Sequence, residues 1–135
     1  MINKIFVNLP VQDLQRSMSF FSSLGFTFNK QFTDENAACL VISDEFYAML
    51  LVRKIFKSFI KKEIADSAKS TEVILALNTD SRAEVDSLVT KALAAGAKEY
   101  REAEDHGWMY GRSFEDLDGH LWEVGYMDPA HVEPV

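Results

Sequence analysis

The feature that most constrains the fold is a pattern that occurs twice along this chain of 135 residues. In each copy an apolar strand precedes a helix with a polar N-cap, a glycine ends the helix, and three short strands follow. The N-caps are Asp13 and Ser81, and the glycines are Gly25 and Gly96. The repeat predicts an α+β fold of two βαβββ modules in one chain, with curled mixed sheets that enclose a cleft.

The strands around each helix follow from apolar runs between polar turns. The first strand is expected over Ile2–Leu9 and to end at Pro10, which has no N–H for a ladder. Ser81 to Glu84 fits a capping box at the start of the second helix. The other expected strands are Phe26–Phe32, Ala37–Ile42, Phe46–Val52, Thr71–Asn78, Ala97–Arg101, Trp108–Phe114 and His120–Tyr126.

The segment between the two copies has a different composition. Residues 53–70 contain six Lys or Arg together with apolar residues at helical spacing. Such a stretch can lie on a membrane surface, but a helix that covers one edge of the fold is the favoured interpretation. The predicted organisation is therefore a first module over 1–52, a partly helical linker over 53–70, a second module over 71–128 and a tail over 129–135.

Charge and cysteine content exclude several classes of partner. Fourteen basic and twenty-one acidic residues give a net charge of −7, which argues against nucleic acid or an anionic membrane as the main partner. A cationic or neutral small ligand is compatible with this charge. Cys39 is the single cysteine, so we expect no internal disulfide and no cysteine-based metal cluster. The sequence shows no recognisable signal peptide and no apolar run of membrane-spanning length, so a cytoplasmic setting is expected.

Three segments carry a resemblance to a known family: Asn8–Ser17, Phe20–Phe26 and Gly111–Glu123. The last is similar to a family ending F-x-D-P-D-G-x-x-x-E, with Leu117 in the place of proline. Together they resemble the vicinal oxygen chelate superfamily, which includes glyoxalase I, bleomycin-resistance proteins and extradiol dioxygenases. The resemblance implies the corresponding two-module fold and a homodimer, but not one reaction, since the family supports unrelated chemistries.

The resemblance also implies where a metal would be held, on the first and last strands of each module. It places the first ligand at Phe6, whose side chain cannot bind a metal, and the matching ligand of the second module at Glu72. The last ligand position is Glu123, and Phe46–Val52 offers no His, Glu or Asp. Two carboxylates alone would bind Mg²⁺ or Ca²⁺ weakly.

Glu123 and Glu72 share the predicted cleft face by strand parity. If the two carboxylates approach each other, one has a raised pKa and suits a catalytic base, so Glu123 is the candidate base or metal ligand. In the alternative, one of them points to the cleft rim or pairs with Arg112, Arg101 or Lys4. The other candidate ligand-binding residues of the cleft are Phe6, Asn8, Met49, Ile74, Trp108, Tyr110 and Arg112. The last three alternate along one strand and could stack on a flat or anionic ligand, or form a dimer surface.

Two functions remain open. The first is a protein that binds a small organic molecule in an aromatic-lined cleft, without a tight metal site or another cofactor. The second is a metal-dependent lyase, isomerase or dioxygenase resembling glyoxalase I, with a divalent metal held by Glu72 and Glu123. Whether the chain is an enzyme is not decided by its sequence.

Overall fold

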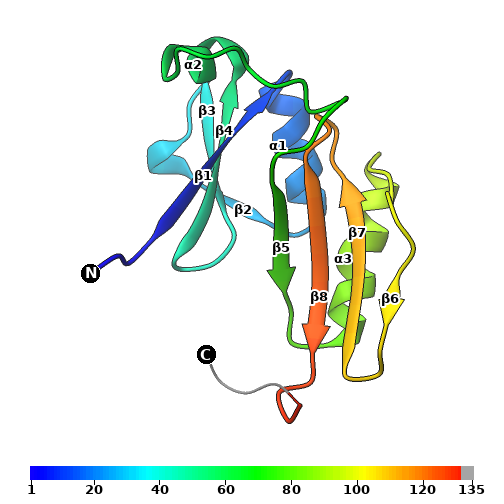
Figure 1. Cartoon of the computed structure of the whole chain (residues 1–135). Helices are drawn as coiled ribbons and strands as arrows, with labels where there is room; N and C mark the ends of the chain where they lie inside the picture. Colours follow the sequence, from blue (N-terminus) through cyan, green and yellow to red (C-terminus); the bar gives the residue numbers. More distant parts are fainter. Residues whose placement is uncertain (132–135) are drawn as a thin grey trace. The chain divides into compact units, whose positions relative to one another are not determined.

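The computed structural model describes residues 1–131, so residues 132–135 of the expected tail lie outside the described part. The chain divides into an N-terminal unit, Met1–Asp66, and a C-terminal unit that begins at Ser67. Each unit contains one open four-stranded sheet, and both sheets have the same arrangement of strands (Figure 1). Within residues 1–131, no helix is long and apolar enough to cross a membrane.

The N-terminal unit follows the predicted β-α-β-β-β order. Its elements are β1 (Ile5–Val11), α1 (Leu14–Ser23), β2 (Thr27–Asn29), the 3-10 helix η1 (Lys30–Phe32), β3 (Ala37–Val41), β4 (Phe46–Val52) and α2 (Arg53–Ser58). The strand order is β1-β4-β3-β2, with β1 parallel to β4 and the other pairs antiparallel. The expected strand over Phe26–Phe32 is shortened because the Asn29 side chain accepts a hydrogen bond from the amide of Gln31 and starts η1.

The prediction that the first strand ends at Pro10 is wrong. β1 continues to Val11, and Pro10 lies opposite Leu51 in the parallel ladder with β4. β1 is an outer strand of its sheet, and an outer strand tolerates proline because one of its edges needs no ladder hydrogen bonds.

The start and end of α1 confirm the predicted helix signals. The Asp13 carboxylate accepts a hydrogen bond from the amide of Arg16 at 3.1 Å, and Gly25 has a φ of +100°. Phe20 and Phe21 are buried on the side of the helix that packs on the sheet. A polar cap, an apolar stripe and a left-handed glycine therefore define this helix.

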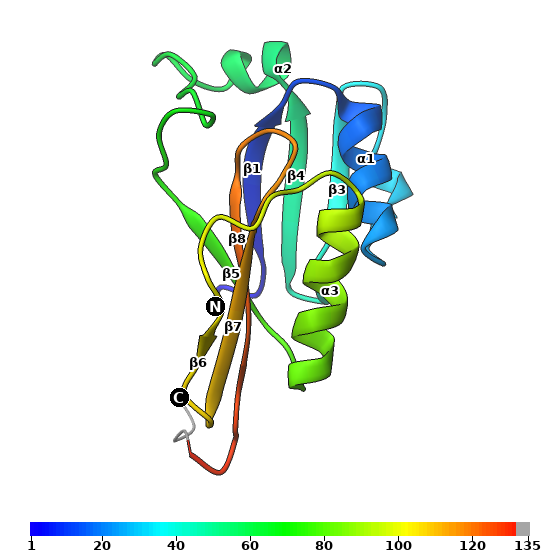
Figure 2. The same ribbon diagram turned by 90° about the vertical axis from the view of Figure 1, so that its right-hand side faces the viewer.

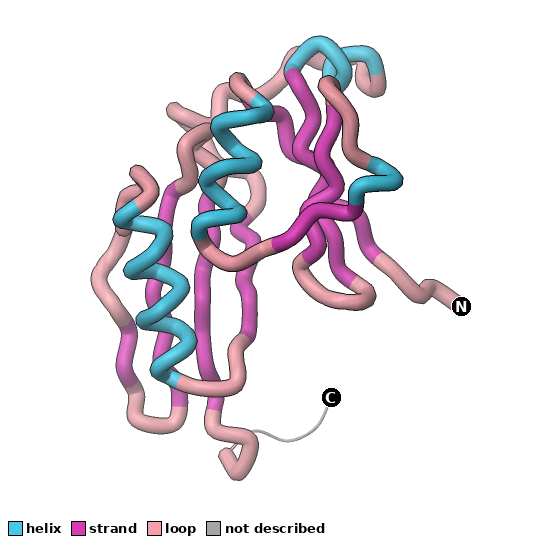
Figure 3. The backbone as a smooth tube through the Cα atoms, turned by 180° about the vertical axis from the view of Figure 1, so that it is seen from behind, coloured by secondary structure: helices cyan, strands magenta, loops and turns pink. Residues whose placement is uncertain are grey.

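The C-terminal unit repeats the same topology. Its elements are β5 (Ile74–Asn78), α3 (Arg82–Ala94), β6 (Glu104–Asp105), β7 (Met109–Glu115) and β8 (Leu121–Met127), in the sheet order β5-β8-β7-β6. Helix α3 contacts β7 and β8 and covers one face of this sheet (Figures 2 and 3). The other face, turned to the viewer in Figure 1, carries no helix of this unit. We call it the open face.

The strand expected over Ala97–Arg101 does not form. Only Lys98 makes a bridge there, with Glu115, and the fourth strand of the sheet is instead β6. The residues from Lys98 to Glu102 are mostly charged, and such residues are poor strand formers. The chain between α3 and β6 is thus free to turn the Arg101 side chain toward the sheet.

The turn before β8 is built by Asp116. One carboxylate oxygen accepts hydrogen bonds from the amides of Asp118 at 2.9 Å and His120 at 3.0 Å, and the other accepts from the Trp122 indole at 2.9 Å. Gly119 completes the turn with a φ of +86°. These residues therefore serve turn formation, and they fix the register at which β8 begins.

Candidate functional site

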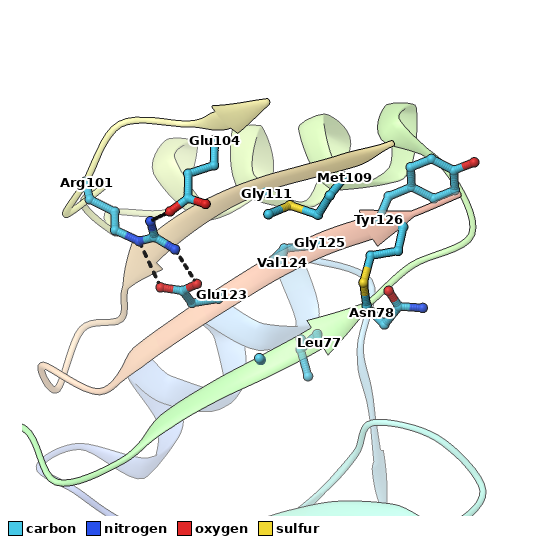
Figure 4. A pocket seen from close by; sticks show the side chains of 12 residues that line it. Leu77, Asn78, Arg101, Glu104, Met109, Gly111, Glu123, Val124, Gly125 and Tyr126 are labelled. Carbon is cyan, nitrogen blue, oxygen red and sulfur yellow. Dashed lines mark hydrogen bonds and ion pairs between the residues drawn. The ribbon is translucent and has the colours of Figure 1, made fainter. Parts of the chain in front are cut away.

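A pocket of about 340 Å³ lies on the C-terminal unit and is lined by residues of β5, β7 and β8 together with Arg101 and Glu104 (Figure 4). Strand alternation explains its position. Trp122 and Val124 of β8 are fully buried, whereas Glu123 and Gly125 point to the open face. The alternation predicted for this last strand is therefore the one observed.

The floor of the pocket contains a row of four residues in register across the sheet. Asn78 of β5 lies opposite Gly125 of β8, Gly125 lies opposite Gly111 of β7, and Gly111 lies opposite Glu104 of β6. We call this row the glycine rung. Because its two central residues have no side chain, the peptide backbone forms the middle of the floor.

The rows on either side of the glycine rung carry side chains. Met109 lies opposite Met127 on one side. On the other side, Glu123 lies opposite both Ala76 and Ser113. The glycine rung is therefore a shallow trough between a thioether pair and the Glu123 carboxylate.

Glu123 is held by two neighbours. The Arg101 guanidinium donates to both of its oxygens, from Nε to Oε2 at 3.0 Å and from Nη2 to Oε1 at 2.6 Å. The Tyr100 hydroxyl donates to Oε2 at 2.8 Å, and Arg101 also forms an ion pair with Glu104. Figure 4 shows the Arg101 side chain between the two carboxylates, at the end of the pocket away from Asn78 and Tyr126.

The expectation of a raised pKa at Glu123 is wrong. The hydrogen-bonded guanidinium of Arg101 lowers the pKa of this carboxyl, the Tyr100 hydroxyl lowers it further, and partial burial opposes them. Of the alternative partners considered from sequence, Arg101 is the one found. A carboxylate stabilised in this way is a poor proton acceptor at neutral pH, so the geometry argues against Glu123 as a general base.

Glu72 does not join Glu123. It lies before β5, four residues ahead of Ala76, the register partner of Glu123. It is also not the counterpart of Phe6. Phe6 precedes its N-cap by seven residues, and the residue seven before Ser81 is Ile74. Both first-strand positions are thus apolar.

These residues do not fit a divalent metal. Both oxygens of Glu123 already accept hydrogen bonds, and a cation there would stand beside the Arg101 guanidinium. Among residues 1–131, no group of three or more His, Cys, Asp or Glu is arranged to hold a metal ion. Transition metals at protein sites need a fuller set of fixed nitrogen and oxygen donors than one occupied carboxylate offers.

Tyr110 and Arg112 lie on the face that packs on α3, not on the open face as expected. The Tyr110 hydroxyl donates to Asp86 of α3 at 2.6 Å, and Arg112 donates to Asp86 at 3.1 Å and to Glu99 at 3.0 Å. The prediction that β7 turns Tyr110 and Arg112 to the cleft is therefore wrong. Trp108, just before β7, stacks on His131 with ring centroids 4.3 Å apart.

The remaining candidates belong to the N-terminal unit. Phe6 stacks on Tyr47 of β4 with ring centroids 4.8 Å apart, and Asn8 lies opposite Met49. Ile74, by contrast, lies on the open face of the C-terminal unit, opposite Leu121. A ligand-binding role for these side chains stays a prediction.

Sequence reasoning missed most of the residues that shape the trough: Tyr100, Glu104, Met109, Gly111, Gly125 and Met127. A signal existed for two of them. An isolated glycine within a strand pattern often marks a close approach of a ligand or another backbone. The position of Arg101 had no such signal, because it depends on the irregular chain between α3 and β6.

Comparisons with known proteins agree with this architecture. The family model described as "Bleomycin resistance protein-like N-terminal" matches residues 4–43. A hypothetical protein from S. aureus is 31% identical, with 93% of this chain and 95% of that chain covered and a TM-score of 0.78. No curated protein sequence matches the chain.

Two further solved structures share the fold at lower identity. A glyoxalase-related enzyme from Fulvimarina pelagi is 20% identical, with 93% of this chain and 88% of that chain covered and a TM-score of 0.79. The fosfomycin resistance protein FosX from Mesorhizobium loti is 15% identical, with 97% and 98% covered and a TM-score of 0.70.

Proposed function

Starting from the fact that the chain belongs to the vicinal oxygen chelate superfamily, we propose that it binds a small organic molecule on the open face of its C-terminal unit, without a tightly bound metal. One observation carries the proposal. Glu123, the carboxylate at the expected end of a metal-ligand set, is bound by Arg101 and Tyr100 beside a pocket of about 340 Å³. The pocket has a backbone floor, the Met109 and Met127 thioethers on one side and the Glu123 carboxylate on the other, and small-molecule sites commonly combine an apolar lining with a few polar groups in this way.

The alternative function, a metal-dependent lyase, isomerase or dioxygenase, would require Glu123 to exchange the guanidinium for a metal cation. The apolar side chains of Phe6 and Ile74 offer no further ligand. The glyoxalase-related enzyme and the fosfomycin resistance protein are too distant in sequence to support more than the fold. The donor set therefore favours binding over metal-assisted chemistry.

A homodimer is part of the same proposal. Ile5, Phe6 and Phe46 of the N-terminal unit are 50%, 47% and 51% exposed, and neighbouring apolar side chains of this kind often mark an interface. Light scattering on the full chain would test it. We expect a mass of two chains for the wild type and of one chain for a Phe6→Ser, Phe46→Ser variant; a monomeric wild type would remove the dimer from the proposal.

We exclude nucleic acid and membranes as partners because the net charge of the chain is −7, and like charges repel. A cytoplasmic location is proposed as the setting that the sequence leads us to expect.

The binding function can be tested by screening chelator-treated protein against a diverse set of organic fragments by ligand-observed NMR. Gly111→Leu would fill the trough, because a Cβ at Gly111 makes contacts no shorter than 3.8 Å and the larger side chain extends over the floor. Thr27→Leu, on an exposed strand position of the N-terminal unit, is the matched control. We expect fragments that bind the wild type and the control but not the Gly111 variant. Equal binding to all three proteins would disprove the proposed site.

A further inference from the structure

The two glycines of the trough are explained neither by backbone conformation nor by packing. The positive-φ glycines among residues 1–131 are four others, so Gly111 and Gly125 have conformations open to any residue. A Cβ would meet its nearest atom at 3.8 Å from Gly111 and at 3.5 Å from Gly125, which is ordinary van der Waals contact. Since glycine in a strand costs roughly 0.5–1 kcal/mol relative to alanine, two side by side need another reason.

Their common effect is a patch of backbone that carries no side chain of its own, with the Met109 sulfur 3.8 Å from the position that a Cβ of Gly111 would take. The Met109–Met127 row and the Glu123 row lie on either side of it. Rows on the same face are two residues apart along a strand, so roughly 13 Å separates the methionine row from the Glu123 row. A flat ring can lie in this space against the peptide groups once the flexible Met109 side chain turns to the edge of the ring, a contact that sulfur makes favourably with aromatic rings.

The charge around the trough is negative. One guanidinium, that of Arg101, stands between the carboxylates of Glu104 and Glu123, and the His106 imidazole lies 3.5 Å from the second Glu104 oxygen. Two carboxylates and one guanidinium leave an excess of one negative charge. Arg101 lowers the pKa of both carboxyls, so both are ionised at neutral pH. Glu104 also ends the glycine rung, so its carboxylate adjoins one edge of the bare floor, with the Asn78 amide at the other.

We propose that this trough takes planar aromatic molecules that carry a cationic nitrogen group, such as an aromatic amidine, with the ring over Gly111 and Gly125 and the cation beside Glu104. This rests on the proposed function and names the ligand class of the same site. A saturated ring makes fewer close contacts with the flat peptide groups and has no aromatic edge for the thioethers to contact. An anionic group would meet two carboxylates.

Four probes of similar size separate shape from charge: benzamidine, benzamide, benzoate and cyclohexanecarboxamidine. Each would be titrated into the full-length ¹⁵N-labelled protein while the amide resonances of Gly111 and Gly125 are followed. We expect benzamidine to shift both resonances saturably and to bind at least about fivefold more tightly than the other three, the scale of one charge-assisted contact.

Variants locate the interaction. Glu104→Gln is expected to weaken benzamidine binding about fivefold while benzamide is unaffected. Gly111→Val should weaken benzamidine binding by at least about tenfold, since it removes the flat floor. Thr27→Val in the N-terminal unit is the control and should change nothing. Gly125→Ala, a smaller change, gives the same comparison if Gly111→Val disturbs the spectrum as a whole.

Two results would overturn the inference. The first is benzoate or cyclohexanecarboxamidine binding as tightly as benzamidine at the two glycines, in which case the trough binds small molecules but not this class. The second is the absence of any shift with all four probes. The fragment screen on Gly111→Leu decides the proposed function separately, because it does not depend on ring planarity or charge.

Discussion

The two units have the same topology but carry different residues at corresponding positions of their sheets. Asn8 and Ala76 each precede the N-cap of their unit by five residues, and their register partners are Met49 in the N-terminal unit and Glu123 in the C-terminal unit. One row further along, β4 presents Leu51, which is 2% exposed, where β8 presents Gly125.

The difference shows how a repeated fold acquires one site. Caps, helix-ending glycines and strand order are common to both units, and they specify the sheet. The site depends on a few positions of one face, where side chains that fill the sheet surface in the N-terminal unit are replaced by a carboxylate and by glycine. The trough is thus a local change on a shared scaffold.

The largest effect should come from the pair Leu51 and Gly125. We expect Leu51→Ala to lower the free energy of unfolding by about 3 kcal/mol, since it removes buried apolar volume. Gly125→Ala should instead raise it by roughly 0.5–1 kcal/mol, because the new methyl group meets only ordinary contacts and alanine loses less backbone freedom on folding than glycine. Urea denaturation followed by circular dichroism measures both. Similar losses for the two variants would mean that the faces do not differ as described.

The glycines of the turns give the next contrast. A Cβ at Gly119 would lie 2.5 Å from the carbonyl oxygen of Ser67, in a residue with φ of +86°. Gly119→Ala should therefore cost at least about 2 kcal/mol. Gly25→Ala in the N-terminal unit, where a Cβ meets nothing within 4 Å, should cost about 1 kcal/mol from backbone strain alone. The same denaturation experiment compares them, and a cost for Gly25→Ala equal to or above that of Gly119→Ala would contradict this account.

The ion pair of Glu123 predicts a pH-dependent effect. Because its folded-state pKa is lowered, the carboxylate stabilises the fold above its unfolded pKa of about 4.3, and this contribution is lost as the pH falls further. We expect Glu123→Gln to cost about 1 kcal/mol at pH 7 and progressively less between about pH 5 and pH 3.

Glu72→Gln is the matched control for that experiment. The Glu72 side chain is exposed and precedes β5, so its change should alter the free energy of unfolding by less than about 0.5 kcal/mol at any pH in this range. A Glu123→Gln penalty that stays constant across the range would show that the carboxylate charge contributes nothing.

The smallest expected effect is that of Tyr100→Phe, which removes one hydrogen bond to Glu123. It should cost about 0.5 kcal/mol and raise the pKa of the Glu123 carboxyl, while leaving the Arg101 contacts in place. Carbon-detected NMR titration of the glutamate carboxyls measures the pKa. An unchanged Glu123 pKa would remove Tyr100 from the site.

Most of the fold was predictable because its signals are local. Asp13 and Ser81 cap the helices, and Gly25 and Gly96 follow them with positive φ, as their sequence positions indicate. Pro10 was misread because edge position, which makes proline acceptable, is a property of the assembled sheet.

The site was less predictable because it depends on which face of a strand is covered. Tyr110 and Arg112 alternate correctly along β7, yet the alternation does not say which set faces α3. Arg101 approaches Glu123 from a segment where the expected strand is absent, so no periodic pattern connects them. Gly111 and Gly125 are adjacent only through the antiparallel register of β7 and β8.

The central claim is that the Arg101 guanidinium occupies the Glu123 carboxylate in a site that works without metal. Titration calorimetry of Zn²⁺, Ni²⁺ and Mn²⁺ into chelator-treated full-length protein tests this claim most directly. The Glu123→Gln variant is the reference. The account predicts no stoichiometric binding in the micromolar range and the same heats for both proteins. Binding of one ion per chain that disappears in Glu123→Gln would contradict it.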